Sequence, residues 1–73
     1  MVSVEIGSRW SILYRPTKED PARSRKFTVG SLRDLGGLSA AECFWEQDED
    51  GQGWWMPVAD FALEAVRPLG SAL

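Results

Sequence analysis

Apolar and polar residues alternate with a period of two in several short segments of this chain, and glycine or proline separates the segments. The first segment, at residues 2–6, reads VSVEI, the second, at residues 9–14, reads RWSILY, and a third, at residues 26–32, reads KFTVGSL. Successive side chains of a β-strand point to opposite faces of its sheet, so this period predicts strands with one buried face. We therefore expect a mainly β fold.

The segments between these strands carry turn signals. Residues 15–25, RPTKEDPARSR, contain two prolines and no apolar period, which predicts a long exposed loop. Gly36 and Gly37 interrupt the alternation further on, because glycine adopts backbone angles that are closed to other residues. A turn is therefore expected after the third strand.

Two later segments fit more than one element. Residues 39–47 have capping-box spacing for a helix, but their aromatic run leads into the turn-rich sequence DEDGQG, which favours one arm of a hairpin. We expect a strand over residues 41–47 and its returning arm at residues 54–56. Residues 58–66 match a helical period, and a helical turn at residues 58–62 followed by an extended segment fits equally well.

The chain has 73 residues and one cysteine, so it cannot form an internal disulfide. A chain of this length supports one core, which predicts one domain over residues 1–69 and a frayed tail at residues 70–73. The apolar members of each period are expected to be mostly buried. They are Val4, Ile6, Trp10, Ile12, Phe27, Val29, Trp45, Phe61 and Val66.

Several kinds of chemistry do not fit this composition. The chain has no histidine, which excludes zinc sites with imidazole ligands and triads with a histidine base. The acidic run that begins at Glu46 approximates a calcium loop, but Pro57 falls where that loop needs a bidentate Glu. We therefore expect no metal, no cofactor and no enzymatic activity.

The composition also bears on the compartment. No apolar run reaches the length of a membrane span, and the first residues do not resemble a signal peptide. A lone cysteine fits a reducing environment. These features predict a cytoplasmic protein that does not enter a membrane.

Charge is distributed unevenly along the chain, whose net charge is −3. Residues 1–41 hold seven basic and four acidic side chains, whereas residues 42–73 hold one basic and seven acidic side chains. One interpretation is a pair of solvated loops of opposite sign that attract each other. The other interpretation is that one of the two charged segments binds a partner.

The order of the expected elements resembles that of Src-homology-3-like barrels. Members of that family have an ALYDY strand before a long loop, a WW pair after an acidic loop, and a Pro-x-x-Tyr helical turn. The segments SILYRP, DGQGWW and MPVADF occupy the corresponding places here, with Pro16 and Phe61 where the family has tyrosines. The segments IGSRW and WWMPVADFALEAV also resemble short bacterial and phage domains with this barrel. The resemblance implies a small barrel of five to six short strands with one helical turn.

The adjacent residues Trp54 and Trp55 are the main functional signal. Neighbouring residues of a strand face opposite ways, so one of the two indoles is expected to be exposed. We expect Trp54 to be the exposed member, because Gly51 and Gly53 lie beside it, and Trp55 to be the core member. An exposed indole gives up burial energy and is commonly part of an interface. An alternative of equal weight is that the loop at residues 15–26 covers both rings.

The leading hypothesis is a non-catalytic protein-interaction module of a bacterium, phage or other mobile element. In it, an exposed aromatic beside an acidic turn meets a basic or Pro-containing segment of another protein. The predicted binding residues are Trp54, Trp55, Tyr14, Glu46, Asp48 and Asp50.

Two alternatives remain open from the sequence. One is nucleic-acid binding by a basic segment that contains Arg15, Lys18, Arg23, Arg25 and Lys26. The other is a small inhibitor of a host system, which fits the size and acidity of the chain. A charge map separates the first two hypotheses, because an aromatic beside acids favours a protein partner and an aromatic beside bases favours nucleic acid.

Overall fold

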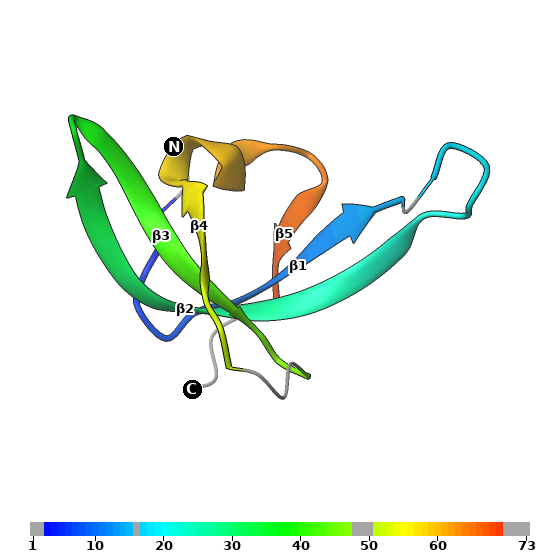
Figure 1. The fold of residues 1–73 in the computed structure, drawn as a ribbon, viewed down its shortest axis with the longest axis horizontal. Coiled ribbons are helices and arrows are strands. Elements are labelled where there is room, and N and C mark those ends of the chain that lie inside the picture. The colour runs from blue at the N-terminus through cyan, green and yellow to red at the C-terminus, as the bar shows by residue number, and fades with distance from the viewer. Residues whose placement is uncertain (1–2, 16, 48–50, 70–73) are drawn as a thin grey trace.

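One antiparallel sheet dominates the computed structural model, which describes residues 3–15, 17–47 and 51–69 (Figure 1). In these residues the sheet has five strands in the order β4-β3-β2-β1-β5 and is accompanied by one 3-10 helix, η1. The elements are β1 (Arg9–Tyr14), β2 (Arg23–Leu35), β3 (Leu38–Trp45), β4 (Trp54–Pro57), η1 (Val58–Ala62) and β5 (Val66–Pro68). The expectation of a mainly β fold is confirmed.

The central strand, β2, is long enough to belong to two hairpins. Phe27 lies opposite Trp10 of β1 on one side and opposite Trp45 of β3 on the other. A bulge between Val29 and Ser31 adds one residue to β2 without adding one to β3. Such a bulge bends a strand and increases its twist, and β2 curves along its length in Figure 1.

Glycine makes the turn between β2 and β3. Gly36 and Gly37 have φ of 62° and 88°, the positive values that a tight two-residue hairpin turn requires at both positions. Leu35 and Leu38 face each other across this turn. The expected turn is confirmed. The loop expected at residues 15–25, between β1 and β2, is shorter than predicted, because β2 already begins at Arg23.

The two ambiguous segments are resolved by pairing. The expected strand at residues 41–47 is confirmed as β3, and β4 is its returning arm. The helical turn expected at residues 58–62 is confirmed as η1, whereas a helix continuing to residue 66 is wrong. Leu63 is already extended, and Val66 pairs with Ile12 of β1.

The strand expected at residues 2–6 is wrong for the part of it that the structure describes. Residues 3–8 form no strand there, and Gly7 has a φ of 90° in a turn. The backbone N–H of Gly7 donates to the oxygen of Val29, and the N–H of Val29 donates to the oxygen of Ser8. The turn leaves Ile6 with 65% of its surface exposed, so the expectation that Ile6 is buried is also wrong.

The core lies on the inner face of the bent sheet, beneath η1. Its buried side chains are Trp10, Phe27, Val29, Ala41, Cys43, Met56, Phe61 and Val66, and Val4, Ile12, Trp45 and Trp54 pack against them while only partly buried. Apart from Ile6, the residues expected in the core are therefore either buried or packed against its margin. The helix η1 contacts β3, β4 and β5.

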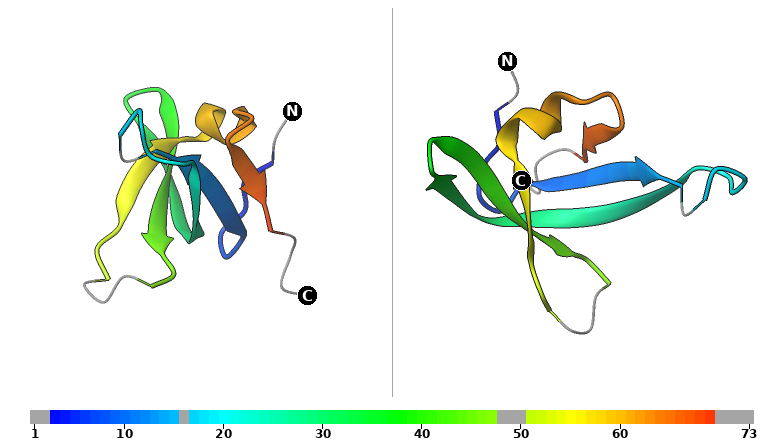
Figure 2. Two further views of the ribbon diagram at one scale, coloured as in Figure 1. Left: turned by 90° about the vertical axis from the view of Figure 1, so that its right-hand side faces the viewer. Right: turned by 45° about the horizontal axis from the view of Figure 1, so that its top comes forward.

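The sheet is open. In the described part of the chain, β4 and β5 are the two edge strands and do not pair, and Figure 2 shows them on opposite sides of the molecule. The helix η1 lies between β4 and β5 in the chain and contacts both strands. A closed barrel is therefore not confirmed. No helix among the described residues is long and apolar enough to cross a membrane.

Candidate functional site

The two adjacent tryptophans point to opposite faces of the sheet. Trp54 lies opposite the buried Cys43, and its ring packs 5.3 Å from that of Phe27 on the inner face. Trp55 lies opposite Glu42 and has 39% of its surface exposed. The expectation of one exposed indole is confirmed, but its assignment to Trp54 is wrong, because the register between β3 and β4 turns Trp54 inward.

The outward side chain of Trp55 belongs to a larger surface, which we call the outer face. On β3, the even-numbered residues from Leu38 to Phe44 point away from the buried Ala41 and Cys43. Their partners on β2 and β4 point the same way. The outer face therefore contains Thr28, Ser31, Arg33, Leu35, Leu38, Ala40, Glu42, Phe44, Trp55 and Pro57, of which Ala40 is buried.

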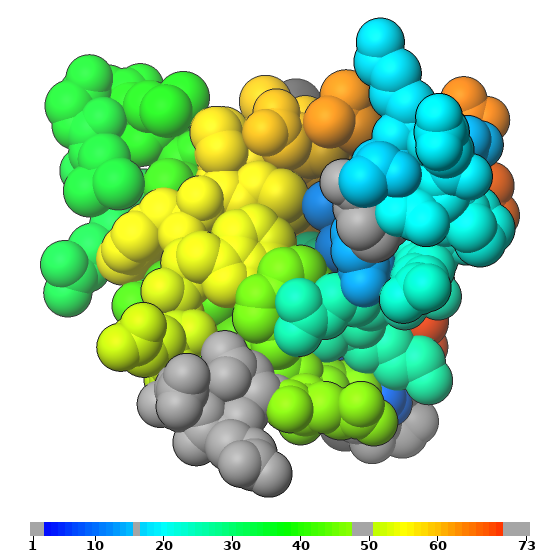
Figure 3. Space-filling view, turned by 45° about the vertical axis from the view of Figure 1, so that its right-hand side comes forward, coloured from blue at the N-terminus to red at the C-terminus, as the bar shows by residue number. Residues whose placement is uncertain are grey.

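Large apolar side chains on this face are open to solvent. Leu35 is 46% exposed and Leu38 is 51% exposed, and they form a cross-strand pair at the end of the hairpin. The β2–β3 hairpin, green in Figure 3, projects from the rest of the molecule. Sequence reasoning did not include these leucines among the binding residues, although their position on either side of two glycines was a usable signal.

Phe44 is held against the sheet by two glycines. A Cβ added to Gly30 would collide with the Phe44 ring, and one added to Gly53 would lie 2.8 Å from the same ring. Gly30 is in β2 and Gly53 directly precedes β4, so the two glycines lie on either side of β3. The Phe44 ring thus lies close over the backbone, and Gly53 serves this packing rather than exposure of Trp54.

A cation and a carboxylate flank Trp55. The guanidinium carbon of Arg33 is 5.7 Å from the centroid of the Trp55 ring, within the range of a cation–π contact. Glu42 lies directly opposite Trp55 and accepts a hydrogen bond of 3.1 Å from the Ser31 hydroxyl. The exposed indole is therefore bordered by both signs of charge.

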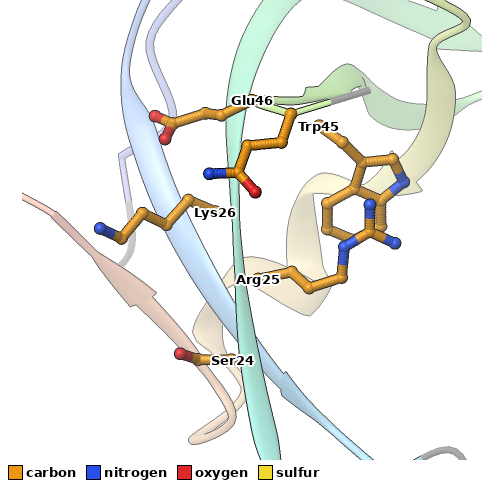
Figure 4. Close-up of a pocket in the computed structure, with 6 residues that line it drawn as sticks. Ser24, Arg25, Lys26, Trp45 and Glu46 are labelled. Carbon is orange, nitrogen blue, oxygen red and sulfur yellow. The ribbon is translucent and has the colours of Figure 1, made fainter. Parts of the chain in front are cut away.

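Trp45 occupies a second aromatic cluster, at the margin of the inner face. Its ring stacks on Trp54, with centroids 4.9 Å apart and an angle of 29° between the planes. The guanidinium carbon of Arg25 lies 4.0 Å from the Trp45 centroid. Figure 4 shows the Arg25 side chain lying against the Trp45 indole. The Nε1 of Trp54 is buried and has no hydrogen-bond partner among the described residues.

The predicted basic segment does not form one patch. Arg15 lies outside β1 and β2, as does Lys18, whereas Arg23, Arg25 and Lys26 are in β2. Alternation places Arg23 and Arg25 on the face of Tyr14 and Ile12, their partners in β1, and Lys26 on the other face.

The predicted acidic surface is divided as well. Glu46 forms an ion pair with Arg9, with 2.6 Å between Oε1 and Nε. The hydrogen bond from the Arg9 guanidinium lowers the pKa of Glu46 below its ordinary value. Asp48 and Asp50 lie outside the described residues. Tyr14 lies opposite Arg23, so the structure does not bring Tyr14, Glu46 and Trp55 together.

The described ranges contain neither an exposed thiol nor a cluster of metal ligands. Cys43 is buried, and burial, with the charge of Glu42 as a second cause, raises the pKa of its thiol to about 12. No three His, Cys, Asp or Glu side chains in residues 3–15, 17–47 and 51–69 come close enough to hold a metal ion.

Comparison of the chain with family models, curated proteins and solved structures finds no match.

Proposed function

We propose that this protein is a non-catalytic protein-interaction module that binds its partner through the outer face, with Trp55 as the anchor. The observation that carries the proposal is the exposure of Trp55 beside Arg33 and on the same face as Leu35 and Leu38. Tryptophan and arginine are the residues most enriched among those that dominate binding energy at protein interfaces. An exposed apolar patch with a polar border is typical of such an interface.

The partner chemistry follows from the side chains around Trp55. The apolar residues favour an apolar or aromatic segment, and the guanidinium of Arg33 favours a carboxylate beside it. Of the described carboxylates near this surface, Glu46 is paired with Arg9, and Glu42 accepts a hydrogen bond from the Ser31 hydroxyl. We therefore propose an apolar partner segment with an acidic residue, in place of the basic segment that the sequence suggested.

The fold proposal has its own support. A long loop after β1, a tight turn after β2 and a 3-10 helix directly after Pro57 follow the element order of Src-homology-3-like barrels. The curved β2, shared by two hairpins, is compatible with such a barrel in an open form. We propose this relationship on the order of elements alone.

Nucleic-acid binding is supported by one contact, that of Arg25 with Trp45. A base needs a free aromatic face on which to stack. Both faces of Trp45 are covered, one by Arg25 and the other by Trp54. The net charge of −3 and the division of the basic residues between two faces also favour a protein partner.

The test is a nuclease-treated pull-down from host lysate with wild-type protein and Trp55→Ala. We expect Trp55→Ala to weaken capture of specific partners by about 2 kcal/mol, or about thirtyfold, while the protein stays folded by circular dichroism. Leu63→Ala is the matched control, because Leu63 is also exposed but lies after η1, outside the sheet. Equal partner profiles for all three proteins would contradict the proposal.

A further inference from the structure

The first part of β2 has a free edge. The last residue of β3, Trp45, pairs with Phe27 of β2. Beyond this pair, the N–H of Glu46 donates one further hydrogen bond of 3.1 Å to the oxygen of Lys26. From Lys26 back to Arg23, β2 continues with β1 on one side. No described strand pairs with it on the other side.

The register identifies which backbone groups face this edge. The oxygen of Lys26 points toward β3, whereas the N–H and oxygen of Val29 point toward residues 7–8 on the β1 side. Backbone groups of alternate residues point to opposite edges of a strand. The N–H and oxygen of Ser24 therefore point to the free edge, where no backbone group of the described residues reaches them.

Charged side chains and an aromatic ring border the same edge. Ser24, Arg25, Lys26, Trp45, Glu46 and Gln47 line a pocket of about 210 Å³ there. In Figure 4, Arg25 lies against Trp45 on one side of β2, and Lys26 and Glu46 point to the other side. The charge of Glu46 is paired with Arg9, and among the described residues no carboxylate forms an ion pair with Arg25 or Lys26, so the charges that β2 contributes to this pocket are positive.

We propose that the free edge of β2 at residues 23–26 binds an extended acidic segment of a partner, which adds a strand to the sheet. In this mode the main chain of the ligand pairs with Ser24, and its side chains alternate between the two faces. Carboxylates on one face meet Arg25, and those on the other face meet Lys26. This site is separate from the outer face and goes beyond the function proposed above.

The positive charge of this edge favours an acidic partner strand over a second copy of this chain. Lysine and arginine on an exposed edge discourage pairing with a second edge of the same sign, which is how native sheets avoid aggregation. The edges of two copies of this chain would bring Arg23, Arg25 and Lys26 against the same cations. An acidic strand gains attraction from the side chains that repel a second copy.

The probe for the test is a fluorescein-labelled peptide with the repeat Glu-Glu-Val-Val, which places carboxylates on both faces of an extended strand, and a peptide with the repeat Lys-Lys-Val-Val is its charge-reversed control. Binding is followed by polarisation and by amide hydrogen exchange. We expect the acidic peptide to bind, the basic peptide not to bind, and the Ser24 amide to become protected from exchange. Trp55→Ala is expected to bind the acidic peptide as the wild type does, so failure here and failure of the outer-face proposal are distinguishable.

Ser24→Pro and Ser24→Ala form a matched pair. Both remove the hydroxyl, but only proline removes the N–H, which faces the free edge and not β1. We expect Ser24→Pro to weaken peptide binding by about tenfold or more, and Ser24→Ala to bind as the wild type does.

A backbone test on wild-type protein decides the matter if Ser24→Pro does not fold. Peptides N-methylated at alternate residues lose the hydrogen bonds of one edge only. One of the two methylated series should lose binding and the other should retain it. Equal binding by both series would overturn the proposal, and so would tighter binding of a short oligothymidine with protection of the same residues.

Discussion

The ring of Phe61, in η1, meets the ring of Trp10, in β1, edge to face, with centroids 4.9 Å apart and an angle of 79° between the planes. Both residues are buried, and the centroid of the Phe61 ring also lies 5.9 Å from that of the Phe27 ring. This contact holds the 3-10 helix over the open sheet. The packing of η1 therefore compensates for strand pairing that the sheet lacks between β4 and β5.

Replacing Trp10 tests the importance of that contact. Trp10→Ala is expected to destabilise the fold by about 3 to 5 kcal/mol, enough to unfold much of so small a protein. Leu13→Ala, on the same strand but exposed, should change stability by no more than about 0.5 kcal/mol. Urea unfolding followed by circular dichroism measures both, and a Trp10→Ala midpoint equal to that of Leu13→Ala would contradict the assigned inner face.

The close approach of Gly30 to Phe44 predicts a coupled pair of substitutions. Gly30→Ala should destabilise the protein by about 1 to 3 kcal/mol, because the new methyl group overlaps the Phe44 ring. The cost should shrink when Phe44 is already Ala, since nothing then occupies that space. A double-mutant cycle measures the coupling, and equal costs in both backgrounds would show that the ring does not constrain residue 30.

The pair formed by Arg9 and Glu46 predicts a small pH dependence of stability. The pKa of Glu46 is lower in the folded state than its usual value of 4.5. The contribution of the pair is therefore present above that usual value and is lost as pH falls through the folded pKa. Both groups are exposed, so the effect is modest. The difference in unfolding midpoint between wild type and Glu46→Gln should be visible near pH 7 and vanish at low pH, and a difference that grows on acidification would refute the assignment.

Cys43 should be inert in the folded protein. Burial raises the pKa of its thiol to about 12, so the thiolate that reacts with disulfide reagents is scarce at pH 8. We expect labelling by an aromatic disulfide reagent to be slow in buffer and fast in urea. Rapid labelling of the folded chain would mean that the strand β3 opens readily or that Cys43 is accessible.

Alternation of apolar residues was a sufficient signal for the elements in which one face is buried. It predicts β1 and the middle of β2, because Trp10, Phe27 and Val29 must all reach one core. It fails at Ile6, where the turn at Gly7 directs the side chain outward. A two-residue period cannot distinguish a strand from a short extended segment that ends in such a turn.

The candidate site depended on register, which local patterns do not specify. Whether Trp54 or Trp55 is exposed follows from the pairing of Trp54 with Cys43, and a shift of one residue would reverse it. The basic residues are separated for a different reason, because β2 already begins at Arg23 and alternation along it places Arg25 and Lys26 on opposite faces. Composition identified the kinds of residue available for binding, whereas the faces on which they lie required the structure.

The pairing of β1 with β5 has a consequence for biosynthesis. Trp10 lies opposite Pro68, so one side of an early strand is completed by one of the last described residues. Strand contacts this far apart in sequence form slowly, and here they form only after residue 68 has left the ribosome. Until then the β2–β3 hairpin can form, but Trp10 lacks the cover of Phe61 and Val66. The nascent chain therefore carries the Trp10 indole exposed until the segment that contains Phe61 and Val66 has emerged.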